Sequence, residues 1–225
     1  MIALTRLRLL GFVRTGRAVA PLIAAAAALS ILYGGGQARA DEAYGVSALV
    51  LFPLLAWQTK ILLDVEPDVQ RRLAVTAVGS RRRELAAGLL AAVAAGLATV
   101  ALAMAAPWLA GALQPDDRPA GTAIGLVAHL LALPGAVALG ALASRAVTGS
   151  AGNGAAVLVT GSVLAIVLGL KASPLQWLVP PLMAATRLTT SGHYPAAAVV
   201  TVVGQAVLWS AAACWGYARL RRNRV

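Results

Sequence analysis

Long apolar stretches separated by short charged loops make up nearly the whole chain. A helix that crosses a membrane needs about 20 mostly apolar residues, and each stretch is close to that length. The spacing predicts six spans, at about residues 18–36, 43–63, 85–111, 121–143, 152–170 and 195–218. Because these spans leave no room for a soluble domain, we expect residues 1–225 to form a single all-α membrane domain.

The Lys and Arg residues gather on alternate loops. If the N-terminus is cytoplasmic and every stretch crosses, the cytoplasmic side holds fifteen of the 19 Lys and Arg residues. The other side holds only Arg39, Arg118, Lys171 and Arg187. Such an asymmetry follows the positive-inside rule. It predicts a multi-pass protein of the cytoplasmic (plasma) membrane with both termini in the cytoplasm.

Composition agrees with a membrane protein. The hydrophobic fraction is 60%, whereas soluble domains have about 45–50%. A formal net charge of +11 is often typical of nucleic-acid binding, but here the basic loops that set topology, and their attraction to anionic lipid, account for it. We therefore expect the lipid bilayer as a partner and no nucleic acid.

The first apolar stretch also resembles a secretory signal, because Ala38-Arg39-Ala40 has the form of a cleavage site. Two features favour a retained span. The basic segment before the stretch is long, and the stretch itself is long enough to cross a membrane.

An uncharged segment of fifteen residues, ASPLQWLVPPLMAAT, lies between the fifth and sixth predicted spans. It is too short to cross a membrane and contains the helix-breaking pair Pro180 and Pro181. Trp177 suits the headgroup level, where aromatic side chains gather. We predict a short re-entrant or interfacial hairpin before the last span; an apolar surface loop is the alternative.

Few residues in the spans carry recognisable chemistry. No carboxylate lies well inside a span, no Cys or carboxylate completes a zinc site, and neither Lys belongs to a P-loop sequence. His129 and Gln205 are polar groups at membrane depth, so each either bonds between helices or contacts a transported substrate. We expect no catalytic residue, no metal and no cofactor in this chain.

The loop between the second and third predicted spans, LLDVEPDVQRRLAVTAVGSRRREL, predicts a short helix. Asp64 or Glu66 can cap its N-terminus, with Pro67 in the first turn, where a missing N–H costs nothing. Asp68 favours the positive end of the helix dipole, and Gly79 is placed to end the helix.

The same helix is amphipathic. Val65, Val69 and Leu73 share one face, and Arg71 and Arg72 add charge. A capped amphipathic helix between two spans is suited to docking a cytoplasmic partner. The alternative is a solvated loop that only sets topology.

These features resemble the permease subunits of type-2 ATP-binding-cassette exporters over most of the chain. The shared features are a basic segment before the first span, six spans, the loop DVEPDVQRRLAVTAVGSRRRELAAGLLAA and the segment SPLQWLVPPLMAATRL. The resemblance implies that residues 64–82 form a coupling helix that seats on a separate P-loop ATPase. It also implies that residues 172–190 form short re-entrant helices, and that a second permease, identical or related, completes the path.

In that family the ATPase subunit carries the ATP and Mg²⁺, so the resemblance implies a half-transporter that is not itself an enzyme. The resemblance implies coupling roles for seven residues: Asp64, Glu66, Asp68, Val69, Arg71, Arg72 and Leu73. Three further classes stay open: an ATP-independent carrier, a membrane enzyme, and a non-transporting anchor or immunity subunit.

The predicted orientation can be tested by labelling single cysteines in a Cys214→Ala background. Cysteines at Gln114 and Ser191 should react with an impermeant thiol reagent in intact cells. Cysteines at Gln70 and Asn153 should react only after permeabilisation, because the basic loops stay inside. Labelling at Gln70 from outside would reverse the orientation.

Overall fold

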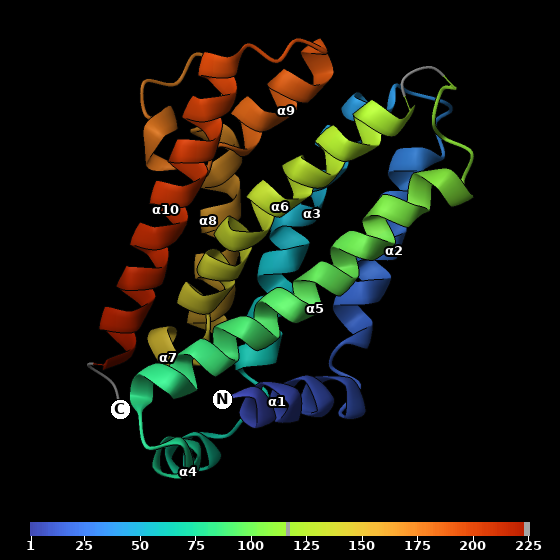
Figure 1. Ribbon diagram of the computed structural model, residues 1–225. Helices are drawn as coiled ribbons and strands as arrows, with labels where there is room; N and C mark the ends of the chain where they lie inside the picture. The colour runs from blue at the N-terminus through green and yellow to red at the C-terminus, as the bar shows by residue number, and fades with distance from the viewer. Residues whose placement is uncertain (116–117, 223–225) are drawn as a thin grey trace.

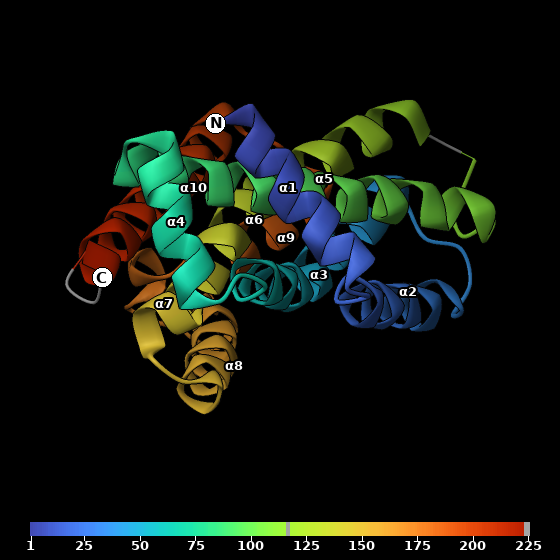
Figure 2. The same cartoon turned by 90° about the horizontal axis from the view of Figure 1, so that it is seen from below.

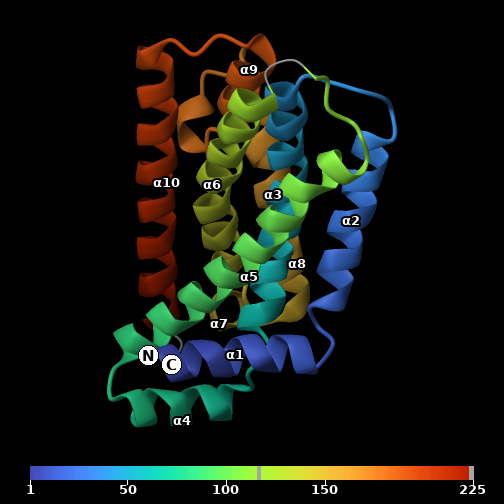
Figure 3. The same cartoon turned by 45° about the vertical axis from the view of Figure 1, so that its right-hand side comes forward.

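The computed structural model describes residues 1–115 and 118–222, and the regular elements in this part of the chain are helices. Four of them are long and apolar enough to cross a membrane: α3 (Ala40–Leu63), α5 (Arg81–Leu109), α6 (Arg118–Leu142) and α10 (Ala196–Arg222). They stand side by side in a bundle, with α5 oblique across it (Figures 1 and 3). For the described residues, an all-helical fold with several helices long and apolar enough to span a membrane is therefore confirmed.

Two of the predicted spans differ from the expectation. The first is α2 (Val19–Tyr33), which is bent by 73° from α1 (Ile2–Arg14); together the two would be a fifth span. The fifth predicted span is α8 (Ala151–Val167), an apolar helix of 17 residues that is about 26 Å long, less than the ~30 Å of a hydrocarbon core. Four or five helices of spanning length and composition are thus found, in place of six.

Helix α3 is the centre of the bundle, and its closest contact is with α6. Glycines of α6 allow the two backbones to approach, as small residues do between membrane helices. A Cβ atom added at Gly125 would lie 2.3 Å from the Tyr44 Cβ atom, and one at Gly140 would lie 2.2 Å from the Ala56 carbonyl oxygen. The spacing of Gly121 and Gly125 is that of a GxxxG motif, which the sequence analysis overlooked.

Helix α3 is joined to α5 by a buried polar contact. The Gln58 side-chain amide donates to the Ala95 carbonyl at 3.0 Å, and the Thr99 hydroxyl donates to the Gln58 side-chain oxygen at 2.8 Å. Buried polar groups that find partners in this way hold helices together at apolar depth.

One end of the bundle, which we call the basic end, carries both chain termini of the described residues. Helix α1 lies across this end, and α4 (Asp68–Val78) lies beyond it, both roughly perpendicular to the bundle (Figures 2 and 3). Helix α7 (Arg145–Thr148) lies at the same end of the bundle (Figure 3) and contacts α6, α8 and α10. The predicted helix after Pro67 is confirmed, and it ends at Gly79, whose φ of 70° is left-handed and favours glycine.

The predicted cap of α4 is wrong. Pro67 is the N-cap residue, and within the described part of the chain no side-chain hydrogen bond caps the helix. The carboxylates of Asp64 and Glu66 cannot cap α4 because both are held by basic side chains elsewhere at this end.

The opposite end carries a broken segment before α10. A single turn, η1 (Gln176–Leu178), is followed by Pro180 and Pro181 and then by α9 (Leu182–Ser191). Helix α9 packs on α3, where the Thr186 hydroxyl is 3.3 Å from the Gly45 carbonyl oxygen. At the same end, paired backbone hydrogen bonds of 3.0 Å join Ala38 to Ala112 and Gln114, which ties the two loops together.

The outer sides of the bundle expose apolar and aromatic side chains. In α10, Val200 and Leu208 are 70% and 72% exposed, as expected of a helix that faces lipid. Trp215 stacks with Arg219 near the basic end, and Trp108 with Arg118 near the other. Aromatic side chains near both ends of the bundle match the two interfacial belts of a membrane protein.

The α3–α6 contact predicts the effect of one added methyl group. Gly140→Ala should destabilise the protein by about 1–3 kcal/mol, because the new Cβ meets backbone that cannot move aside. Gly204→Ala in α10 is the matched control, since nothing lies within 4 Å of its Cβ position. Thermal unfolding in detergent would measure both, and an equal melting temperature for the two variants would contradict this packing.

Candidate functional site

A buried carboxylate at the basic end, Glu84 at the start of α5, pairs with arginines from two other helices. Arg8 of α1 donates a short hydrogen bond to Glu84 Oε1 and another, of 2.9 Å, to its carbonyl oxygen. Arg221 of α10 reaches the same Oε1 atom at 2.8 Å. Arg8 also pairs with Glu66 Oε2 at 2.7 Å, so the linker between α3 and α4 joins the network.

This network, which we call the Glu84 network, is neutral in sum and buried. Arg8, Glu84 and Arg221 are 5%, 2% and 7% exposed, and Tyr217 closes it with its hydroxyl 3.2 Å from Arg221 Nη1. Two cations face two carboxylates, so each buried charge has a partner. A buried ion loses several kcal/mol of hydration, which only such complete pairing offsets.

A second cluster fixes the end of α3. Asp64 accepts from the Lys60 ammonium at 2.9 Å and from the Arg145 backbone N–H at 2.8 Å. Its carbonyl oxygen accepts from Arg17 at 3.0 Å and from the Arg145 guanidinium at 2.8 Å. The α3 terminus, the α1–α2 turn and α7 therefore meet at one residue.

Helix α4 is attached through one face and presents the other outward. Arg71 is 7% exposed and points back toward the bundle, 3.4 Å from the Leu63 carbonyl oxygen. Val69 and Leu73 are 69% and 63% exposed on the outer face, with Arg72 beside them. The side chain of Asp68 lies outside the described residues.

Six of the seven residues predicted for coupling divide by position; the side chain of the seventh, Asp68, lies outside the described residues. Asp64, Glu66 and Arg71 hold α4 in place within the chain. Val69 and Leu73 are directed to the outside, whereas Arg72 is exposed at the edge of α4 and lines a hollow between α4 and α5. The outer face therefore presents two apolar side chains, with the positive charge of Arg72 at its edge.

His129 lies between α3 and α6, fully buried. Its Nδ1 atom is 2.8 Å from the Gly125 carbonyl oxygen, and its Nε2 atom is 3.2 Å from the Ser47 hydroxyl. The Tyr44 ring stands edge-on to it at 6.2 Å. Both ring nitrogens have hydrogen-bond partners inside the protein. This favours an interhelical hydrogen bond over contact with a transported substrate.

Gln205 is bonded to the broken segment. Its side-chain amide donates to the Gln176 and Val179 carbonyl oxygens at 2.7 and 2.9 Å, and Trp209 donates to the Leu178 carbonyl at 2.9 Å. These bonds satisfy backbone groups that the turn before Pro180 and Pro181 leaves without a helical partner. Trp177 of the same turn is 69% exposed.

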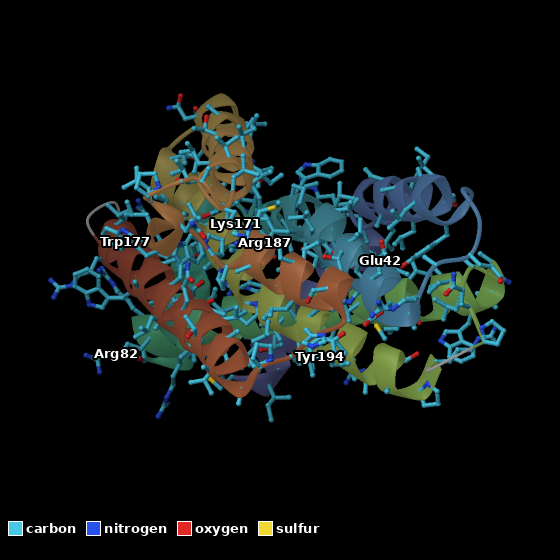
Figure 4. The ribbon with its side chains drawn as sticks, turned by 90° about the horizontal axis from the view of Figure 1, so that it is seen from above. Glu42, Arg82, Lys171, Trp177, Arg187 and Tyr194 are labelled. Carbon is cyan, nitrogen blue, oxygen red and sulfur yellow. The ribbon has the colours of Figure 1, made fainter. Side chains whose placement is uncertain are left out.

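The far end has its own polar cluster, which the sequence analysis missed. The Tyr194 hydroxyl donates to Asp41 Oδ2 at 2.6 Å, and Arg39 pairs with the same oxygen. Burial and this hydrogen bond to the carboxylate both raise the pKa of Tyr194. Figure 4 shows Lys171 and Arg187 next to each other on this end, Tyr194 apart from them and Trp177 toward the edge.

Arg187 explains the close approach of α8 to α9. Its guanidinium donates to the Gly169 carbonyl oxygen at 3.0 Å, just beyond the end of α8. A carbonyl at a helix C-terminus carries partial negative charge, so the arginine also stabilises the end of the short helix.

Neither end offers a metal site: among residues 1–115 and 118–222, no group of three or more His, Cys, Asp and Glu could hold a metal ion. The comparisons with known proteins add no assignment. No protein-family model matches the chain, and no curated protein or solved structure is similar to it.

The Glu84 network predicts a large effect from removing one charge. Glu84→Gln should destabilise the protein by roughly 3 kcal/mol or more, because Arg8 and Arg221 would stay buried without their shared anion. Glu42→Gln is the control, since Glu42 is exposed and such changes cost within about 0.5 kcal/mol. Thermal unfolding of both variants in detergent is the measurement, and a Glu84→Gln variant as stable as Glu42→Gln would contradict the role of the network.

Proposed function

We propose that this chain is the transmembrane half of an ATP-binding-cassette exporter, with the basic end in the cytoplasm and α4 docked on a separate P-loop ATPase. The observation that carries the proposal is α4 itself. It is a short helix at the outermost point of the basic end, anchored by buried charges and exposing Val69 and Leu73.

Exposed apolar side chains on a polar helix need a reason. Val69 and Leu73 lie one helical turn apart on the side of α4 that faces away from the bundle. Arg72 carries charge at the edge of this face, so α4 differs from the apolar helix α8, which suits lipid. A protein partner that buries both side chains accounts for this face better than solvent or lipid does.

The attachment of α4 supports transmission of movement. Glu66 leads into α4, and through Arg8 it connects to Glu84 of α5 and thence to Arg221 of α10. A partner that pushed α4 would therefore act on two candidate spans through short, charged contacts. Such a linkage is what an ATP-driven subunit needs in order to alter the arrangement of the spans.

In this proposal the broken segment is re-entrant. Gln205 lies nine residues beyond the first residue of α10, so the turn bonded to it sits about 14 Å along that helix. With α8 counted as one crossing and the bent pair α1 and α2 as another, the chain crosses six times. Two copies, or this chain and a related one, would enclose the substrate path.

The docking role is tested by the double variant Val69→Asp/Leu73→Asp. Each side chain buried at an interface contributes roughly 1.5–3 kcal/mol, so losing both should weaken ATPase binding by about 100-fold or more. Insertion and thermal stability should stay unchanged, because both positions are exposed. Co-purification of the ATPase and substrate-stimulated ATP hydrolysis are the measurements.

The matched control is Val69→Ile/Leu73→Met, which keeps the apolar surface and should retain binding. Full ATPase binding by the Asp variant would remove α4 from the interface. Transport that persists in ATP-depleted vesicles under an ion gradient would instead favour an ATP-independent carrier.

A further inference from the structure

A hollow of about 560 Å³ lies at the basic end, between α4, the start of α5, α7 and the end of α10. Its volume falls within the ~300–1,000 Å³ that is usual for small-molecule sites. Seven arginines line it, and the only acidic residue among its lining residues is Glu84. That carboxylate is already shared by Arg8 and Arg221, so the hollow keeps a large excess of positive charge.

Three of these arginines have no partner within the described part of the chain. The side chains of Arg72, Arg81 and Arg82 make no hydrogen bond or ion pair with residues 1–115 or 118–222. Arg82 extends past the edge of the ribbon, as Figure 4 shows from the opposite end, so a ligand can reach it from outside the bundle. Clustered like charges repel one another unless an anion lies between them.

The position of the hollow along the candidate spans indicates the source of an anion that could bind there. Leu85 is in the second turn of α5 and Ala218 is in the last turns of α10, so the lining includes the ends of two candidate spans. Trp215 and Arg219 stack at 4.9 Å on the same part of α10, which suits headgroup depth. Val65 and Val75 add apolar surface beside the guanidinium groups.

We propose that this hollow binds the phosphate group of an anionic phospholipid from the leaflet at the basic end, with Arg72, Arg81 and Arg82 as its ligands. A guanidinium group fits phosphate with two parallel hydrogen bonds, and basic pockets between membrane helices are suited to lipid headgroups. The bound phosphate would bridge Arg72 of α4 to Arg81 and Arg82 of α5. The lipid thus holds α4 against the bundle, whatever α4 itself docks on.

The test uses the full chain, delipidated in a neutral detergent and titrated with phosphatidylglycerol in mixed micelles. Binding is followed by native mass spectrometry and by the melting temperature. Phosphatidylglycerol should bind and raise the melting temperature, whereas phosphatidylcholine should not. Arg72→Gln/Arg81→Gln/Arg82→Gln should weaken phosphatidylglycerol binding by about 100-fold, as expected from the loss of three charges near a lipid headgroup.

The matched control is Arg6→Gln/Arg14→Gln/Arg83→Gln, which removes three exposed arginines of the same end that do not line the hollow. It should bind phosphatidylglycerol as the wild type does. A second variant, Arg72→Lys/Arg81→Lys/Arg82→Lys, keeps the charge. It should bind phosphatidylglycerol with intermediate affinity, because Lys cannot form the paired hydrogen bonds.

Several results would overturn the proposal. Equal loss of binding in the two Gln variants would mean general attraction to a basic surface. A similar gain with phosphatidylcholine would mean that charge is not recognised. Inorganic phosphate serves as a separate arm: if it alone reproduces the whole rise in melting temperature, the hollow takes free phosphate and not a lipid.

Discussion

The arrangement of the basic end depends on the shared pairing of Arg8 and Arg221 with one buried carboxylate, Glu84. These three side chains come from α1, α5 and α10; α1 and α5 also pack through Phe12, Ala91 and Ala95, and the carboxylate adds α10 to that pair. Each charge is costly to bury singly, and the cost disappears only when all are assembled. An incomplete network would leave a buried charge unpaired, so the three helices are held in one arrangement. Through the Arg8–Glu66 pair the network also holds the linker that leads into α4.

Away from the Glu84 network, the helices of the bundle are held together by a different kind of contact. Glycines let α3 and α6 approach until backbone and side chains touch, and the Gln58–Thr99 bond joins α3 to α5. Neither contact tolerates added volume or a lost partner. In the proposed function, a displacement of α4 would pass through the Glu84 network to α5 and α10.

Hydropathy and charge were enough to predict the helical class, the four longest helices and the short helix that ends at Gly79. They could not predict that Asp64 and Glu66 leave α4 uncapped, because their partners, Lys60, Arg145 and Arg8, come together only in the folded chain. Periodicity also merges α8 with the residues after it, since apolar sequence alone does not indicate where a helix breaks. Glu84 stood out only as an acid beside three arginines, which at a span end is typical of an exposed position.

Site-specific photo-crosslinking can show whether the outer face of α4 meets a P-loop ATPase, as proposed. A photoreactive amino acid at Val69 is compared with one at Val159, which is exposed on the apolar α8. In native membranes, the photoreactive group at position 69 should form an adduct with a protein that contains a Walker sequence. The group at position 159 should react with lipid. Lipid adducts at both positions, or protein adducts only at position 159, would show that α4 does not dock on an ATPase.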